Sequence, residues 1–153
     1  MAKPIAPDPF WNWQDEPARA LFIEAAKGNV DAQAGLAEGM LAKVLEKRID
    51  RKWGIESALF WARAAVVHGR VYDQRNLATL LIVWADIKYH EGEQEIALLA
   101  EGEAIVILDR LADLGDDTAE SILAAASSKI SQAGFALARR AREEMKATAG
   151  GEA

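Results

Sequence analysis

Apolar residues recur every three or four positions along most of the chain, the spacing that places them on one face of an α-helix. The clearest stripe lies within residues 30–48 and consists of Leu36, Ala37, Met40, Leu41, Val44 and Leu45. In residues 94–114 the predicted core positions are Ile96, Leu99, Ile107, Leu108 and Leu111. The full pattern predicts an all-α protein of about seven helices, over residues 15–27, 30–48, 53–68, 72–89, 94–114, 117–130 and 132–147.

Polar residues and glycines mark the ends of these helices. Asp15, Asp116 and Ser131 stand where a side chain can accept a hydrogen bond from a free amide at the start of a helix. Glycine adopts the left-handed conformation that ends many helices, and Gly69 follows directly on one of them. Because the link around Gly69 is too short for a crossover, the helices on either side are predicted to form an antiparallel hairpin.

A glycine-centred pattern occurs three times. The segments that follow Gly28, Gly69 and Gly115 read NVDAQAGLA, RVYDQRNLA and DDTAESILA. Each has Gln or Glu five residues after the glycine and Leu-Ala at the eighth and ninth positions. The glycines are 41 and 46 residues apart, which is in the range of two-helix repeat units. The chain is therefore predicted to be an array of helical hairpins.

At these positions the chain resembles the Sel-like branch of the tetratricopeptide repeat family. The matching residues are Ala58, Leu59, Trp61, Arg63, Ala64, Ala65, Gly69, Gln74, Leu77 and Ala78 in the second unit, and Ala32, Gln33, Leu36, Ala37 and Met40 in the first. The likeness extends over residues 25–85, and in the third unit Ile107 stands near the place of the family's tryptophan. The resemblance implies a right-handed α-solenoid of antiparallel hairpins, in one domain over residues 15–147.

The resemblance also implies a function, because such solenoids bind a peptide or a partner protein on a concave face lined by the first helix of each hairpin. Carried over through Leu36 and Leu77, the expected contact residues are Glu38, Leu41, Tyr72, Arg75, Asn76 and Thr79. Arg75 and Asn76 are the strongest candidates, because polar groups beside the leucine can bind a peptide backbone. The chain is thus expected to be a non-enzymatic adaptor.

Residues 1–14 contain three prolines, which favour an extended arm over a helix. The arm also carries Phe10, Trp11 and Trp13. Two interpretations remain open: the aromatic side chains pack over the end of the first helix, or Trp11 and Trp13 anchor a partner protein. At the other end, residues 148–153 are expected to form a flexible tail.

Composition narrows the function classes. The chain has 153 residues, 51% of them hydrophobic and 7% aromatic, and has no cysteine. The absence of cysteine excludes disulfides, thiolate metal sites and a cysteine nucleophile. Neither an export signal nor an apolar run long enough to span a membrane is recognisable, so a cytoplasmic protein is expected. The net charge of −6 disfavours a general nucleic-acid binder.

Charge is unevenly distributed along the chain. The central basic residues are Lys43, Lys47, Arg48, Arg51, Lys52, Arg63 and Arg70, whereas residues 86–120 are strongly acidic. Such a bipolar surface suits either steering toward a complementary protein or self-association. Two alternatives to the adaptor follow: an inhibitor or immunity-type protein that blocks an enzyme through its acidic surface, and a nucleic-acid accessory protein that uses residues 43–70.

Candidate chemistry is sparse. His68 and His90 are the only histidines, and neither has the spacing of a metal site. Two of the carboxylates between Asp86 and Glu120 would have to converge in a pocket to act as an acid and base pair, and nothing in their spacing predicts that. The sequence contains no recognisable nucleophile elbow, phosphate loop or dinucleotide fingerprint. No cofactor or metal is expected.

Overall fold

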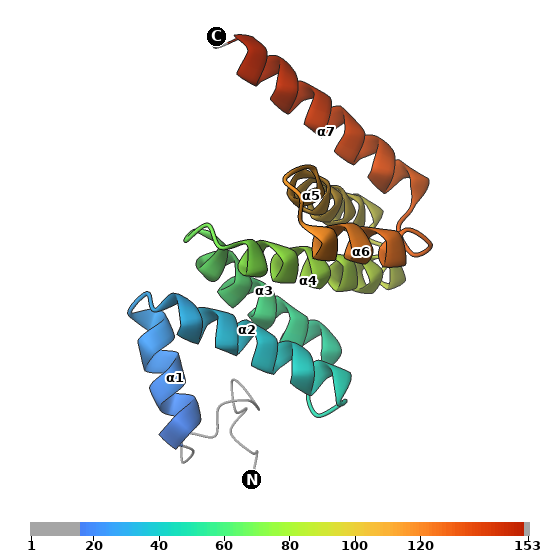
Figure 1. Ribbon diagram of the computed structural model, residues 1–153. Coiled ribbons are helices and arrows are strands. Elements are labelled where there is room, and N and C mark those ends of the chain that lie inside the picture. The colour runs from blue at the N-terminus through green and yellow to red at the C-terminus, as the bar shows by residue number, and fades with distance from the viewer. Residues whose placement is uncertain (1–15, 152–153) are drawn as a thin grey trace. The chain divides into compact units, whose positions relative to one another are not determined.

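The computed structural model describes residues 16–151, and in that range the chain forms seven α-helices and no strand (Figure 1). The helices are α1 (Glu16–Ala26), α2 (Val30–Leu45), α3 (Arg51–Val66), α4 (Val71–His90), α5 (Gln94–Asp113), α6 (Asp117–Ala126) and α7 (Gln132–Gly151). The all-α class and the number of helices predicted from the apolar pattern are confirmed over this range. Helix α7 extends beyond residue 147, where the helical part was predicted to end.

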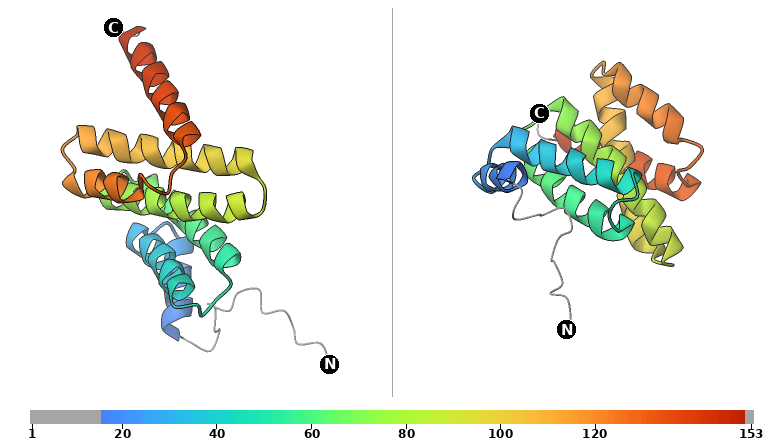
Figure 2. Two further views of the ribbon diagram at one scale, coloured as in Figure 1. Left: turned by 90° about the vertical axis from the view of Figure 1, so that its right-hand side faces the viewer. Right: turned by 90° about the horizontal axis from the view of Figure 1, so that it is seen from below.

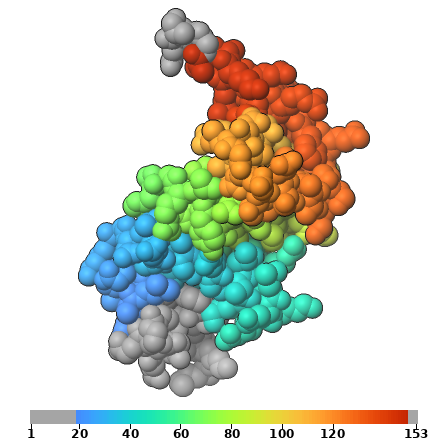
Figure 3. Space-filling view, in the orientation of Figure 1, coloured from blue at the N-terminus to red at the C-terminus, as the bar shows by residue number. Residues whose placement is uncertain are grey.

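Two compact units divide the chain, residues 1–73 and 74–153. In the first unit α2 packs against α1 and α3, and in the second α5 packs against α6 and α7. Figure 2 shows the C-terminal half of α7 extending beyond α5 and α6, and the same projection is visible in the space-filling view (Figure 3). A single domain over residues 15–147 stays a prediction, and the arm at residues 1–14 lies outside the described residues.

The three repeat glycines have one conformation. Gly28, Gly69 and Gly115 have φ angles of +97°, +82° and +91°, in the left-handed region that a residue without a Cβ adopts at little cost. After each glycine, the next helix begins two residues later, at Val30, Val71 and Asp117. The sequence repeat therefore corresponds to a repeated backbone junction.

A polar cap and a left-handed residue fix two of the other helix boundaries. Asp50 Oδ2 accepts a hydrogen bond from the Trp53 amide at 2.9 Å, so α3 begins at Arg51 rather than at residue 53 as predicted. Helix α2 ends at Leu45 rather than at residue 48, because Lys47 is left-handed with a φ of +57° and the Arg48 amide turns back to the Lys43 carbonyl at 2.9 Å.

The core of the first unit is built mainly from small residues and leucine. Leu36, Ala37 and Met40 are fully buried, as the apolar stripe predicted. Trp61 packs with Leu21 at the edge of a buried cluster of Ala25, Ala32 and Leu36, and its ring meets that of Phe22 edge-on at 5.9 Å. The Trp61 ring is only partly buried, so it seals the margin of this core rather than filling its centre.

In the second unit a buried cluster contains Ile105, Ala126, Ile130 and Ala138, with Ile82, Val106, Leu123 and Phe135 packed around it. Leu108 and Leu111 are buried as predicted, but Ile96 and Leu99 are 43% and 63% exposed, so their assignment to the core was wrong. The buried face of α5 runs through Ala97, Ala100, Ala104, Leu108 and Leu111, and the helical turn of 100° per residue places Ile96 and Leu99 beside that face.

Two glycines allow α5 and α7 to approach closely. A Cβ at Gly102 of α5 would lie 3.0 Å from Leu137 Cδ2, and a Cβ at Gly134 of α7 would lie 3.0 Å from Glu101 Cβ and closer still to its carboxylate. Gly102 lies inside α5, and a glycine in a helix interior generally lowers helix stability. The structure gives it a packing role, because a side chain there would push α7 away.

Candidate partner-binding surfaces and polar clusters

The predicted partner-binding residues of α4 lie along one line of that helix, since Tyr72, Asn76 and Thr79 are spaced by four and three residues. Tyr72 is 51% exposed, and Asn76 and Thr79 are half-buried. The Thr79 hydroxyl donates to the Arg75 carbonyl at 3.1 Å, within its own helix. This α4 face therefore offers an aromatic ring and a side-chain amide at the helix surface.

Arg75 lies at the edge of the same face and forms an ion pair. Its Nε is 3.4 Å from Asp116 Oδ2, and the two side chains are 24% and 15% exposed. The other Asp116 oxygen, Oδ1, accepts a hydrogen bond from the Ala119 amide at 3.0 Å and caps α6, as the sequence predicted. Arg75 thus connects α4 to the start of α6, which leaves Asn76 as the stronger of the two favoured candidates.

The predicted contact residues of α2 are Glu38 and Leu41. Glu38 is exposed and Leu41 is half-buried, so the surface of this helix carries one carboxylate and part of one leucine side chain. The remaining candidates, Trp11 and Trp13, lie outside the described residues.

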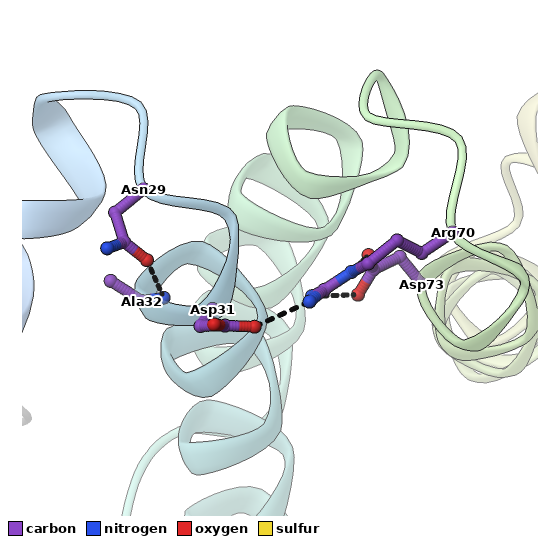
Figure 4. Close-up of polar contacts among 5 residues, drawn as sticks. All are labelled: Asn29, Asp31, Ala32, Arg70 and Asp73. Carbon is purple, nitrogen blue, oxygen red and sulfur yellow. Dashed lines mark hydrogen bonds and ion pairs between the residues drawn. The ribbon is translucent and has the colours of Figure 1, made fainter.

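Arg70 forms a bridge between two carboxylates in the first unit (Figure 4). Its Nη1 donates to Asp31 Oδ1 at 2.5 Å, and its Nε donates to Asp73 Oδ2 at 2.6 Å. The hydrogen bonds that the guanidinium donates, first to Asp73 and then to Asp31, raise its pKa. The Asp73 side chain is 1% exposed, so Arg70 supplies the positive charge that a buried carboxylate needs.

The position after each repeat glycine explains this bridge. Asn29 and Asp116 occupy it in the first and third repeats, and each caps the following helix. Arg70 occupies it in the second repeat and cannot accept a hydrogen bond, so its guanidinium pairs with Asp31 and Asp73 instead. In the sequence Arg70 is one of the central basic residues, although its spacing of three residues from Asp73 is typical of an ion pair within a helix.

A buried polar cluster holds the start of α7 in the second unit. Glu101 is 2% exposed, and its Oε2 accepts hydrogen bonds from the Ser131 hydroxyl at 2.6 Å and the Tyr89 hydroxyl at 3.0 Å. Its Oε1 accepts from the Ser131 amide at 3.3 Å. Ser131 Oγ also accepts from the Gly134 amide at 3.0 Å, which confirms that Ser131 caps α7.

Every member of this cluster is hydrogen-bonded within the cluster, which suits a structural role. Burial is the main cause that raises the pKa of the Tyr89 hydroxyl, so the phenol stays protonated and remains a donor to Glu101. In the sequence Glu101 is one of many carboxylates between Asp86 and Glu120, all expected at the surface. No local signal distinguished it, because its burial depends on α7 packing over α5.

The other candidate groups are also engaged. Lys88 is 7% exposed, with its Nζ 3.5 Å from Glu91 and 3.7 Å from Glu93, and it lies over the Trp84 ring at 4.6 Å. These glutamates therefore offset the charge of Lys88. Among residues 16–151, no group of three or more His, Cys, Asp or Glu side chains could hold a metal ion.

Comparison with known proteins gives no relative: no family model, no curated protein and no solved structure matches the chain. Within the part of the chain that the structure describes, no helix is both long enough and apolar enough to cross a membrane.

Proposed function

We propose that this chain is a non-enzymatic binding scaffold whose helical hairpins stack as a right-handed α-solenoid. Its partner is a peptide or another protein, bound through the helix that follows each repeat glycine. The α4 face of Tyr72, Asn76 and Thr79 is the main contact surface, and Glu38 and Leu41 of α2 are the corresponding residues of the preceding repeat.

The repeated glycine junction is the observation that carries the proposal. In the first two repeats the Leu-Ala pair after the junction is buried, with exposed fractions of 0–3% for Leu36, Ala37, Leu77 and Ala78. In the third repeat Leu123 is only half-buried and Ala124 is exposed. A divergent final repeat is what a terminal cap of a repeat array requires, because its outer side faces solvent instead of another repeat.

One buried contact gives the repeat pattern a physical basis. The side-chain Nε2 of Gln33 donates a hydrogen bond to the Ala25 carbonyl at 3.1 Å. The glutamine five residues after Gly28 therefore connects the start of α2 to the end of α1. Because this carbonyl lies at the C-terminal end of a helix, it has no partner within that helix. At the first junction Gln33 therefore has a structural role within the repeat.

Site-specific photo-crosslinking tests the proposal. A benzoylphenylalanine placed at Tyr72 or Thr79 of the full-length protein should crosslink a discrete partner from a native lysate, and the control position Phe60, which is 66% exposed on α3, should not. Tyr72→Ser combined with Asn76→Ala should abolish capture of the same partner. Crosslinking from Phe60 alone, or capture that survives the double substitution, would place the binding surface elsewhere.

The acidic surface favours a second candidate, an inhibitor that blocks a basic enzyme. Residues 74–153 contain 14 acidic and 8 basic side chains, so the whole net charge of −6 resides in this unit. Such a protein would recover one dominant enzyme in the capture experiment, and its binding would weaken steeply with salt. An adaptor would instead recover a multi-protein complex.

A further inference from the structure

The exposed apolar residues on α5 lie next to the acidic turn that precedes this helix. Ile96 and Leu99 are 43% and 63% exposed, and their spacing of three residues places them on one helix face. The same face continues through Glu103 and Ile107, at intervals of four residues. A leucine with this exposure on a helix has a substantial apolar surface left to bury.

Next to Ile96 the surface is hollowed. A depression of about 380 Å³ is lined by Gly92, Glu93, Gln94, Glu95 and Ile96. This volume is sufficient for one or two side chains of a partner. Its walls combine one branched apolar side chain with two carboxylates, which suits a side chain with an apolar stem and a positive end.

Charge determines which partner complements this surface. Lys88 offsets part of the charge of Glu91 and Glu93, whereas Glu95 is exposed at the side of Ile96 and Leu99. Arg110 lies at the far end of the same helix, more than two turns away. The local net charge is therefore negative. A partner with apolar and basic residues on one face would bury leucine against Leu99 and pair its lysines with Glu95.

We propose that the α5 entry surface, made of Glu93, Glu95, Ile96 and Leu99, docks a basic amphipathic helix of another protein. The bound helix presents apolar side chains to Ile96 and Leu99 and inserts a lysine or arginine between Glu93 and Glu95. This surface does not include the α4 face, so the proposed function stands or falls independently of it.

The test uses an 18-residue probe helix with leucines on one face and lysines on the other, and a matched probe in which every lysine is glutamate. The lysine probe should bind the full-length protein in a calorimetric titration, and the glutamate probe should not. Leu99→Ser and Glu95→Lys should each weaken binding about 10-fold, from the lost apolar contact and the reversed charge. Leu45→Ser and Glu56→Lys are the matched controls at exposed positions of the first unit, and they should leave binding unchanged.

Equal binding of the lysine probe to wild type, Leu99→Ser and Glu95→Lys would overturn the proposal, as would equal binding of the two probes. A change in the sedimentation of the protein on Leu99→Ser, without probe, would also overturn it, because a second copy would then be the occupant. Tyr72→Ser should not affect the lysine probe, so loss of α5 binding and loss of α4 binding are separate outcomes.

Discussion

Gly134→Ala should destabilise the protein even though alanine is the better helix former. Gly134 lies in the first turn of α7, beside the Ser131 cap. A Cβ there would lie 3.0 Å from Glu101 Cβ and still closer to Glu101 Oε2. The carboxylate cannot simply swing away, because it accepts hydrogen bonds from Tyr89 and Ser131.

The magnitude follows from three contributions. Replacing glycine in a helix stabilises by up to about 1 kcal/mol. Overpacking against a fixed neighbour costs roughly 1–3 kcal/mol, and a displaced carboxylate loses at least one charge-assisted hydrogen bond, about 1.5–3 kcal/mol. Together these contributions give a net destabilisation of about 1.5–6 kcal/mol, equivalent to a melting temperature lower by about 3–24 °C for a chain of this length.

Gly35→Ala is the matched control for helix propensity. A Cβ at Gly35 would lie 3.8 Å from Leu21 Cδ1, an ordinary van der Waals contact, so this substitution should raise stability by about 0.5–1 kcal/mol. Urea denaturation followed by far-UV circular dichroism measures both variants, with an unchanged slope as evidence that only stability changed. If Gly134→Ala were as stabilising as Gly35→Ala, the close approach of α5 and α7 described above would be wrong.

Three further substitutions test individual features. Lys47→Gly should raise the free energy of unfolding by about 0.5 kcal/mol, because relief of left-handed strain exceeds the entropy cost of glycine. The control Lys43→Gly, within α2, should lower the free energy of unfolding by about 1 kcal/mol. Urea denaturation midpoints compare the two variants. Trp61→Ala should lower the free energy of unfolding by about 2–3 kcal/mol, less than the loss expected for a fully buried tryptophan. The control Phe60→Ala, at a position that is 66% exposed, should lower it by under about 1 kcal/mol. A wild-type urea midpoint for Trp61→Ala would contradict the contact of Trp61 with the core. The pKa of Tyr89 is raised, so its buried hydroxyl contributes stability that is present below the ordinary tyrosine pKa of about 10 and is lost as the pH rises through the raised value. Wild type should therefore lose more stability than Tyr89→Phe between pH 9 and pH 11. Parallel losses in the two proteins would refute this role of Tyr89.

Local signals were sufficient for the helices and their junctions. The apolar periodicity predicted seven helices, and Asp116 and Ser131 cap α6 and α7 as their positions suggested. Leu36 and Leu77 are buried as the repeat implied. The helices and their caps depend on residues within one or two turns of each other, so backbone propensity and side-chain caps already determine them.

Contacts between distant residues could not be predicted in this way. Glu101 looked like a surface carboxylate and Ile96 like a core residue, but α7 covers the first and the direction of the α5 packing face exposes the second. Arg70 was assigned to a basic surface, yet its charge is shared with Asp31, 39 residues earlier in the chain. The sequence by itself determined how many helices form and where their glycine junctions repeat; only the tertiary structure decided which helix faces meet, because burial and ion pairing depend on helix approach rather than on local spacing.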